Sequence, residues 1–521
     1  MNSSIAIIVL LIEFCTSANI LMITLGGTKS HKIPFWELAR GLLPRGHNVT
    51  FISAFPSDMV MPGLEEITPS SLVFYVKNFT DWDLVGARMR GEEPVHPLDM
   101  LRYGYEACDE FLSDHETKDL MYSGVKYDLL ILDGSYPECV VGLVHHFKAP
   151  FMYINTVGFY TGSLSLAGNP TLYSTTPFLA RPFTDSMTLM QRTTNTIWHL
   201  LGSSMHSFMV RYFIQDILRH HFGRDVPPIY EISKNVSFIL QNAYVTVSYP
   251  RPYLPNVAEI ACIHCKQAKA LPPDLEEFIN GSGEAGFIFV SMGSSVKAAN
   301  MPEYFRRLLL RVFQQLPQRV LWKWETDYDM PDLPPNVKLG RWLPQQDLLG
   351  HRKIRAFVTH GGLLSMFETV YHGVPIVTLP VFCDHDSNAA KAELDGYAVK
   401  LDLSTITVES LLTAIKTVMY DPKYREDVRK KQLLLRDQKE TPLERAIFWT
   451  EYVIRHKGAK HLQSPLKDLN LIQYYLIDVI LVLIFFCFLF YYSVKFVLML
   501  IFAILTSTIS LKLFKKSIKI D

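Results

Sequence analysis

The sequence shows no excess of charge of either sign, because 51 lysines and arginines balance 51 aspartates and glutamates. A neutral chain argues against nucleic acid or an acidic polymer as the main partner, since those ligands bind positively charged surfaces. The 521 residues are too many for one hydrophobic core, so two or more domains are expected. The hydrophobic share of 49% is at the upper end for a globular protein, and apolar runs at both ends of the chain raise it.

Cysteine is scarce. The sequence has seven, and Cys15 and Cys487 fall in the apolar runs at its two ends. The five that remain are a small odd number, which predicts no disulfide framework. Cys262 and Cys265, in the run Cys-Ile-His-Cys, have the spacing of half a zinc site. A zinc site needs a second pair of ligands at comparable spacing, and the sequence offers none, so no metal ion is expected.

The first predicted strand, residues 20–25, is not followed by the G-x-G-x-x-G fingerprint of dinucleotide-binding proteins. The loop Gly-Gly-Thr-Lys-Ser-His takes its place, before a predicted helix at 32–43 and a strand at 49–53. The order strand, loop, helix, strand is typical of the start of a doubly wound α/β domain. The missing fingerprint argues against one alternative function, a nicotinamide-dependent reductase.

Two side chains with catalytic potential follow predicted strands. Ser30 is expected to cap the helix at 32–43, and His31 stands in its first turn, just past the carboxyl end of the first strand. Asp133 ends another buried strand at 129–132. Taken alone, each has a plainer interpretation, a solvated first-turn histidine and a turn-forming aspartate. Their shared position favours a role together, because ligands bind at the carboxyl ends of the strands in such sheets.

The stretch 342–388 organises the second half of the chain. It reads as a buried strand at 356–359, the turn His360-Gly361-Gly362, a helix at 363–371 and a second buried strand at 376–379. A glycine turn at a helix start presents backbone N–H groups and the positive end of the helix dipole, where phosphate binds. Glu368 lies eight residues beyond His360, or about 12 Å along a helix axis. That separation suits a diphosphate at the helix tip and a ribose diol further along.

This stretch resembles the signature of the UDP-glycosyltransferases, in particular the membrane-bound animal enzymes, and the resemblance extends over most of the chain. It implies the GT-B fold, an α/β architecture of two Rossmann-like doubly wound domains facing a cleft. It also implies which residues bind the donor. Trp342 stacks on the uracil, Gln345 contacts the nucleoside, and Glu368 binds the ribose. Ser294, His360 and the Gly362 backbone hold the diphosphate, and Asp384 with its neighbour His385 contacts the sugar.

The resemblance further implies direct displacement at the anomeric carbon, which turns an α-linked donor into a β-glycoside. His31 is then the general base that takes the proton of an acceptor hydroxyl, and Asp133 holds the imidazole. No metal and no cofactor are expected, because the UDP-sugar is a co-substrate and helix-tip N–H groups stabilise the leaving UDP. The Met- and aromatic-rich segment 159–230 suits a pocket for a small lipophilic acceptor, although residue by residue a plain core is the better expectation.

Two departures from the family pattern leave the donor sugar open. Members that use glucuronic acid often have Asn where Leu364 stands, and commonly Gln where His385 stands. Glucose is therefore the first expectation, glucuronic acid the second, and galactose stays open. The other function class is an inactive membrane-anchored protein that binds a lipophile or a nucleotide. The intact His31, Asp133 and Glu368 argue against it. The sequence does not decide between a monomer and a homo-oligomer.

The expected domain organisation follows from these elements. It comprises a signal peptide (1–18), an acceptor-binding domain (19–249), a linker (250–283) and a UDP-sugar-binding domain (284–440). A returning helix with a juxtamembrane segment (441–474), a transmembrane region (475–511) and a basic tail (512–521) follow. Four glycosylation sequons follow the predicted signal peptide as possible glycan sites, and they begin at Asn48, Asn78, Asn235 and Asn280. Asn48 enters a predicted strand and is expected to be poorly accessible.

More than thirty apolar residues near the C-terminus indicate a membrane segment, interrupted only by Lys495. Four lysines after residue 511 place the tail in the cytosol if there is one span. With the signal peptide, this predicts a single-pass protein of the endoplasmic reticulum membrane with lumenal catalytic domains. Two short spans or a re-entrant segment remain the alternative, because the apolar run exceeds one crossing.

Overall fold

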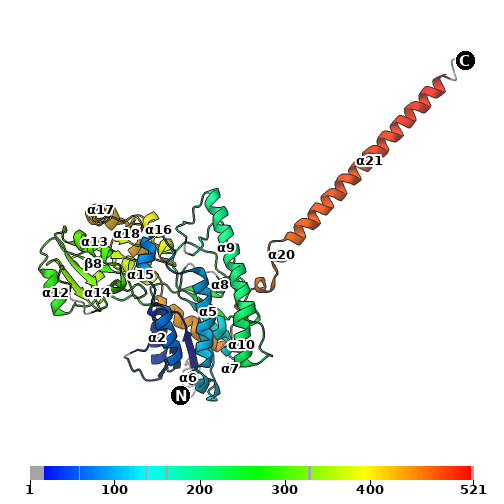
Figure 1. The fold of residues 1–521 in the computed structure, drawn as a ribbon. Coiled ribbons are helices and arrows are strands. Elements are labelled where there is room, and N and C mark those ends of the chain that lie inside the picture. Colours follow the sequence, from blue (N-terminus) through cyan, green and yellow to red (C-terminus); the bar gives the residue numbers. More distant parts are fainter. Residues whose placement is uncertain are drawn as a thin grey trace, which may run out of the picture. The chain divides into compact units, whose positions relative to one another are not determined.

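A computed structural model describes residues 17–57, 59–135, 138–158, 162–179, 181–326 and 330–517. The predicted signal peptide lies outside these residues except for its last two. The chain divides into two compact units, 1–464 and 465–521, and each is described by itself (Figure 1). The first unit contains two parallel sheets with helices on both faces, as the sequence predicts.

The first sheet has seven parallel strands in the order β3-β2-β1-β4-β5-β6-β7. Strands β1, β4 and β5 lie at its centre, and their carboxyl ends therefore meet at one edge. The strands are β1 Asn19–Thr24, β2 Asn48–Ser53, β3 Leu64–Ile67, β4 Leu129–Asp133, β5 Phe151–Asn155, β6 Phe238–Gln241 and β7 Val257–Glu259. Strand β7 belongs to the segment that the sequence analysis assigns to the linker.

Alternation along β1 shows why helices cover both faces of this sheet. Leu21 and Ile23 pack on one side among residues of α3, α5, α6 and α7, while Ile20 and Met22 pack on the other among residues of α2 and α19. The helices of this half are α2 Lys29–Leu42, α3 Ser70–Phe79, α4 Leu84–Met89, α5 Pro97–Ser113, α6 His115–Tyr122, α7 Val141–Phe147, α8 Gly162–Leu166, α9 Leu189–Met209, α10 Gln215–Phe222 and α11 Ile229–Ser233. Both faces are apolar, as expected for a buried parallel sheet.

The second sheet has six parallel strands in the order β10-β9-β8-β11-β12-β13. Ile288 and Val290 of β8 pack with α13 and α17 on one face, and Phe287 and Phe289 pack with α12, α14, α15 and α18 on the other. The strands are β8 Phe287–Ser291, β9 Arg319–Lys323, β10 Val337–Gly340, β11 Ile354–Thr359, β12 Ile376–Thr378 and β13 Ala398–Lys400. The helices are α12 Pro273–Asn280, α13 Glu303–Phe313, α14 Gln345–Leu349, α15 Leu363–His372, α16 His385–Leu394, α17 Val408–Tyr420 and α18 Pro422–Arg436.

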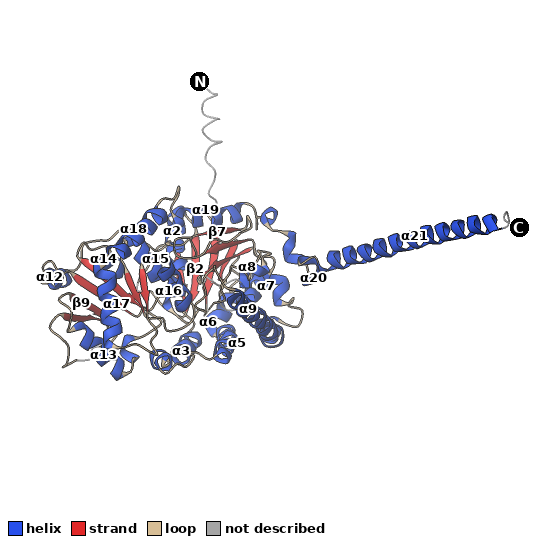
Figure 2. Ribbon diagram, turned by 90° about the horizontal axis from the view of Figure 1, so that it is seen from above, coloured by secondary structure: helices blue, strands red, loops and turns tan. Residues whose placement is uncertain are grey.

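Helix α19, Pro442–Arg455, leaves the second domain and packs on α2, β6 and β7 of the first (Figure 2). Thr441 caps it through a reciprocal capping box with Glu444, which fixes where the helix starts. Helix α19 thereby attaches the end of the first unit to the first sheet.

Helix α9 corrects the expectation of a plain core. Met190, Leu201 and Phe208 are 74%, 58% and 54% exposed, and Met205 and Phe213 are exposed as well. Met187, just before the helix, and Met209, its last residue, are buried. The helical spacing is present, but periodicity identifies an apolar face without identifying what covers it.

Three smaller expectations are also wrong. Four of the five body cysteines pair, as Cys108–Cys139 and Cys262–Cys265, because the fold brings them together. Asn48 is exposed, since the first residue of β2 projects at the rim of the sheet. The residue that precedes α2 is Thr28 rather than Ser30, and its side chain makes no capping bond.

The second unit contains the short helix α20, Leu471–Tyr474, and the long helix α21, Ile477–Ser517. Within the described residues, one helix is long and apolar enough to cross a membrane, Ile477–Leu513, with a mean hydropathy of 2.5. It continues through Lys495 without a break. Its 37 residues extend over about 55 Å, more than the roughly 30 Å of a bilayer's hydrocarbon core.

Candidate active site

His31 and Asp133 meet at the carboxyl edge of the first sheet. His31 is the third residue of α2 and Asp133 is the last residue of β4. The imidazole Nδ1 lies 2.8 Å from Asp133 Oδ2. The sequence places these residues 102 positions apart, and the adjacency of β1 and β4 brings them together. The structure therefore contains the predicted pair.

The Asp133 carboxylate is buried and held by several donors. It accepts hydrogen bonds from the hydroxyls of Thr24 at 3.0 Å and Thr156 at 3.1 Å, and from the backbone N–H of Ser135 at 3.0 Å. A carboxylate with this many donors has a fixed orientation, so the direction of its bond to His31 is fixed too. Thr24 and Thr156 are not among the residues predicted from the sequence for this site. Their position at the ends of β1 and β5 is the signal that could have found them.

The hydrogen-bond pattern defines the state of the imidazole. Nδ1 donates to Asp133, and the Thr156 hydroxyl oxygen lies 2.7 Å from the same nitrogen. The neutral ring then carries its proton on Nδ1 and leaves Nε2 as the proton acceptor. Burial lowers the pKa of His31, but the charge of Asp133 and its hydrogen bond, with a contribution from Asp384, outweigh burial and leave that pKa raised. His31 is thus a stronger base than an ordinary histidine.

Gly26 allows the ring to lie where it does. A Cβ at this position would lie 2.7 Å from His31 Nδ1 and 2.8 Å from His31 Cβ. Those distances are too short for any larger residue, so the backbone of the loop approaches the imidazole closely. The Gly-Gly loop has this role in place of a dinucleotide fingerprint.

His360 lies at the corresponding edge of the second sheet, directly after β11. Its ring is 4% exposed and lies between Gly293 and Gly362, where no Cβ has room. Burial lowers the pKa of His360 well below its usual value, and His385 and Lys323 add to this. The ring is therefore neutral. Gly362 is the N-cap of α15, so the unpaired N–H groups of this helix start beside the ring.

Gln345 and Glu368, predicted to contact the nucleoside and the ribose, lie together. Gln345 Nε2 donates to the Glu368 carboxylate and, over 2.9 Å, to Ser365 Oγ. Glu368 is 8% exposed. Trp342 is 73% exposed, with the Lys29 ammonium 5.3 Å from its ring centroid. Ser294 is exposed in the loop after β8. An exposed aromatic ring can stack on a base, and a buried carboxylate can accept hydrogen bonds from ribose hydroxyls.

Asp384 and His385 stand at the start of α16. Asp384 accepts a hydrogen bond from Asn388 Nδ2 at 2.8 Å, and the same amide donates to the Gly361 carbonyl at 2.9 Å. Burial raises the pKa of Asp384. Burial lowers the pKa of His385 to about 3, with a further contribution from the cation of Arg88. These two residues thus present an acid and a neutral imidazole.

Residues of both domains meet at this site. Arg88, on α4 of the first domain, donates from Nη2 to both carboxylate oxygens of Asp386 at 3.0 Å, and Lys400 lies 3.0 Å from Asp386 Oδ1. The Ser387 hydroxyl donates to the Arg181 carbonyl at 2.9 Å. Asp384 acts on the pKa of His31. The carboxyl edges of the two sheets therefore face each other.

Within the described ranges, no group of three or more His, Cys, Asp or Glu side chains could hold a metal ion. Cys262 and Cys265 are joined to each other, and a disulfide does not supply thiolate ligands. The half zinc site suggested by their spacing is therefore a different feature, a closed four-residue loop.

Two parallel doubly wound domains with facing carboxyl edges define the GT-B class of glycosyltransferases. The family model for UDP-glucoronosyl and UDP-glucosyl transferase matches residues 84–509. A UDP-glycosyltransferase of Dactylopius coccus, UGT5, is 34% identical over 482 residues, covering 91% of this chain and 90% of its own. The rabbit (Oryctolagus cuniculus) UDP-glucuronosyltransferase 2C1 is 37% identical over 472 residues, covering 87% of this chain and 92% of its own.

A solved structure has the same fold. The UDP-glucosyltransferase of Polygonum tinctorium aligns with a TM-score of 0.56 and is 16% identical, covering 84% of this chain and 99% of its own. The chain belongs to the UDP-glycosyltransferase family. It is a glycosyltransferase with a UDP-sugar as donor, and the sequence prediction of family and fold is confirmed.

Proposed function

We propose that the protein transfers a hexose from a UDP-sugar to the hydroxyl of a small lipophilic acceptor with inversion, giving a β-glycoside. The observation that carries the proposal is the 2.8 Å contact between His31 Nδ1 and Asp133 Oδ2. It leaves Nε2 as the proton acceptor at the edge of the first sheet that faces Asp384 and α15 of the second domain. General-base catalysis requires this arrangement when the nucleophile is an alcohol.

The chemistry proceeds in one displacement. The acceptor O–H gives its proton to His31 Nε2 as its oxygen bonds to the anomeric carbon from the face opposite UDP. The bond from that carbon to the UDP oxygen breaks, and the electron pair leaves with the β-phosphate. Asp133 stabilises the imidazolium that forms. The N–H groups at the start of α15 stabilise the developing charge on the diphosphate. One displacement inverts the configuration, and the UDP-sugar is a co-substrate, so no cofactor takes part.

Glucose is the donor sugar that the site supports best. Glucuronic acid carries a carboxylate, which needs a cation to offset its desolvation. Asp384 and His385 offer an acid and an imidazole that is neutral because its pKa is about 3. The nearby cation of Arg88 is already bound to Asp386. A neutral hexose, glucose first and galactose next, fits this set better than glucuronic acid.

A lipophilic acceptor and a lumenal body complete the proposal. The segment of α9 and its neighbours is rich in Met and aromatic side chains, which suit an apolar acceptor. Two disulfides in the body, Cys108–Cys139 and Cys262–Cys265, suit an oxidising compartment such as the lumen of the endoplasmic reticulum. The helix Ile477–Leu513 would anchor the body, with the basic end of the chain in the cytosol.

The test is turnover by microsomes with UDP-glucose, UDP-glucuronate and UDP-galactose against a panel of phenols, steroids and sphingoid lipids. We expect a β-glycoside, with its anomeric configuration read by NMR, and the highest rate with UDP-glucose. Protection from thermal unfolding by UDP without any turnover would favour the inactive binding protein. Protection by NAD rather than UDP would contradict the proposal altogether.

A further inference from the structure

The segment from Ile260 to Lys266 forms the seam between the two domains. Ile260 and Ile263 pack in the core of the first domain, whereas Ala261 and Cys262 pack in the core of the second. The Cys262–Cys265 disulfide closes this seam into a short loop. Cys262 has a φ of 68°, a left-handed conformation that non-glycine residues adopt only where their surroundings impose it. The loop therefore has one imposed shape.

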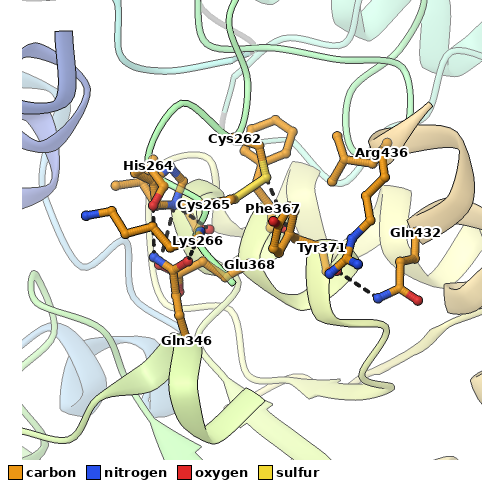
Figure 3. Close-up of a disulfide and its surroundings, with 12 residues drawn as sticks. Cys262, His264, Cys265, Lys266, Gln346, Phe367, Glu368, Tyr371, Gln432 and Arg436 are labelled. Atoms are coloured by element: carbon orange, nitrogen blue, oxygen red, sulfur yellow. Dashed lines mark hydrogen bonds and ion pairs between the residues drawn. A yellow bond between two sulfur atoms is a disulfide. The ribbon is translucent and has the colours of Figure 1, made fainter. Parts of the chain in front are cut away.

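The loop directs a histidine at the helix that carries Glu368. The side chain of His264 is 3% exposed, and its Nε2 lies 3.4 Å from Glu368 Oε1 and 3.3 Å from the Leu364 carbonyl oxygen (Figure 3). Both neighbours are acceptors, so Nε2 carries the ring proton. The disulfide lies against the same helix, with Cys262 Sγ 3.8 Å from the Phe367 carbonyl oxygen.

Glu368 is thereby held from two sides. His264 contacts Oε1, and Gln345 Nε2 donates to Oε2. The two contacts come from different segments, the seam loop and α14. A carboxylate with an amide donor on one oxygen and a polar N–H 3.4 Å from the other is pre-oriented for a third partner, such as a vicinal diol.

The loop is also fixed in position behind His264. Gln346 Nε2 donates to the His264 carbonyl at 3.0 Å, and the Lys266 N–H donates to Gln346 Oε1 at 2.7 Å. The Lys266 ammonium reaches Glu37 of α2 in the first domain at 2.8 Å. The loop that carries His264 is thus held by Gln346 and Glu37 and closed by the disulfide.

We propose that His264, held by the Cys262–Cys265 loop, is a positioning residue that orients the Glu368 carboxylate for the ribose of the donor. The proposal rests on the proposed function, since it requires that Glu368 bind the ribose hydroxyls of a uridine nucleotide. It assigns the seam loop a task in donor recognition, and it makes donor affinity depend on a disulfide far from the reacting atoms.

The test compares UDP with 2′,3′-dideoxy-UDP on the purified full-length protein by calorimetry. His264→Ala should weaken UDP binding roughly 2–12-fold, the range for losing an ordinary hydrogen bond, because 3.4 Å is long for such a contact, and should leave the dideoxy analogue unaffected. His264→Gln keeps an N–H donor near the Nε2 position and should retain most of the preference for UDP. With a model acceptor, the KM for the UDP-sugar should rise more than kcat falls.

His351 offers a matched control. Its Nε2 lies 3.4 Å from Glu276 Oε2, the same separation as in the His264–Glu368 pair, but it precedes β11 at the opposite edge of the sheet. His351→Ala should leave the ratio of the two affinities unchanged. A His264→Ala protein that keeps the wild-type ratio would overturn the inference. A wild-type protein that binds neither nucleotide would instead contradict the proposed function.

The disulfide has its own test. The double variant Cys262→Ser, Cys265→Ser should reduce the preference for UDP over the dideoxy analogue in the same direction as His264→Ala, with unchanged kcat at saturating donor. Cys383→Ser, which changes a free thiol, serves as its control. An unchanged preference in a folded double variant would show that the disulfide does not support His264.

Discussion

The ring of His385 stands edge-on to the ring of His360, with their centroids 4.5 Å apart and their planes at 85°. Burial lowers the pKa of both, so two neutral imidazoles lie where the start of α15 approaches the start of α16. One belongs to the predicted diphosphate site and the other to the predicted sugar site. A change at His385 therefore acts next to the phosphates as well as on the sugar.

Donor choice is predicted to depend on His385. His385→Gln replaces an imidazole by an amide that can donate to and accept from sugar hydroxyls. The relative rates with UDP-glucose and UDP-glucuronate should rise against the rate with UDP-galactose, measured as kcat/KM for each donor. Leu364→Asn tests the second departure from the family pattern separately. Three unchanged relative rates in His385→Gln would show that this position does not select the sugar.

Removal of the Arg88 guanidinium should weaken the contact between the domains. Asp386 would keep Lys400 but lose two hydrogen bonds, and we expect Arg88→Met to cost about 1–3 kcal/mol of stability and to raise the KM for the donor. Thermal unfolding and donor kinetics measure both effects. Arg90→Met is the matched control, because Arg90 pairs with Asp83 and Glu92 in solvent. Equal behaviour of the two variants would contradict a role for the Arg88 contact.

The pH profile should report the coupling of His31 to Asp133. His31 must be neutral to act as a base, and its pKa is raised, so kcat/KM should fall as the pH drops below a value above 6.5. In Asp133→Asn the attraction is gone, burial dominates, and the acidic limb should move to lower pH while the plateau falls.

Asp128→Asn is the control for this profile, because Asp128 stands just before β4, where its Oδ2 accepts the Asn19 N–H at 2.8 Å. It should leave the acidic limb in place. If the acidic limb of Asp133→Asn stays at the wild-type pH, the limb does not report the coupling of His31 to Asp133.

Topology is predicted to be a single span. The 18 residues from Ile477 to Val494 rise about 27 Å, close to the roughly 30 Å hydrocarbon core, so Lys495 would reach the far interface. Protease treatment of sealed microsomes that carry an epitope after Asp521 should remove the epitope and spare the body. A protected epitope would mean that the end of the chain returns to the lumen.

The sequence predicts the central elements well, because buried parallel strands bounded by glycine are distinctive. The strands β1, β4 and β11 and the helix α15 lie within a few residues of their predicted ranges. Strands β3 and β7 were missed, since they are short, half-buried edge strands without an apolar run. The exposed face of α9 was not predicted, because whether other elements bury an apolar helix face depends on the tertiary structure.

The candidate site, too, could be predicted from the sequence only in part. Position at strand ends brought His31 and Asp133 into consideration, but the hydroxyl of Thr156 that contacts both required the packing of β5 beside β4. The contact of His264 with Glu368 joins residues about a hundred positions apart, across a segment that the sequence describes only as a linker. Local pattern cannot reveal such a contact.

The most direct test of the account is the turnover number of His31→Ala beside wild type, Asp133→Asn and the double variant, with UDP affinity measured on each. His31→Ala should lose about 10²–10⁴ of kcat and keep its affinity for UDP, since the proposed base acts on the acceptor hydroxyl rather than on the nucleotide. Asp133→Asn should lose nearly as much, and the double variant little more, because the pair acts as a unit. A His31→Ala protein with near-normal turnover would contradict the account.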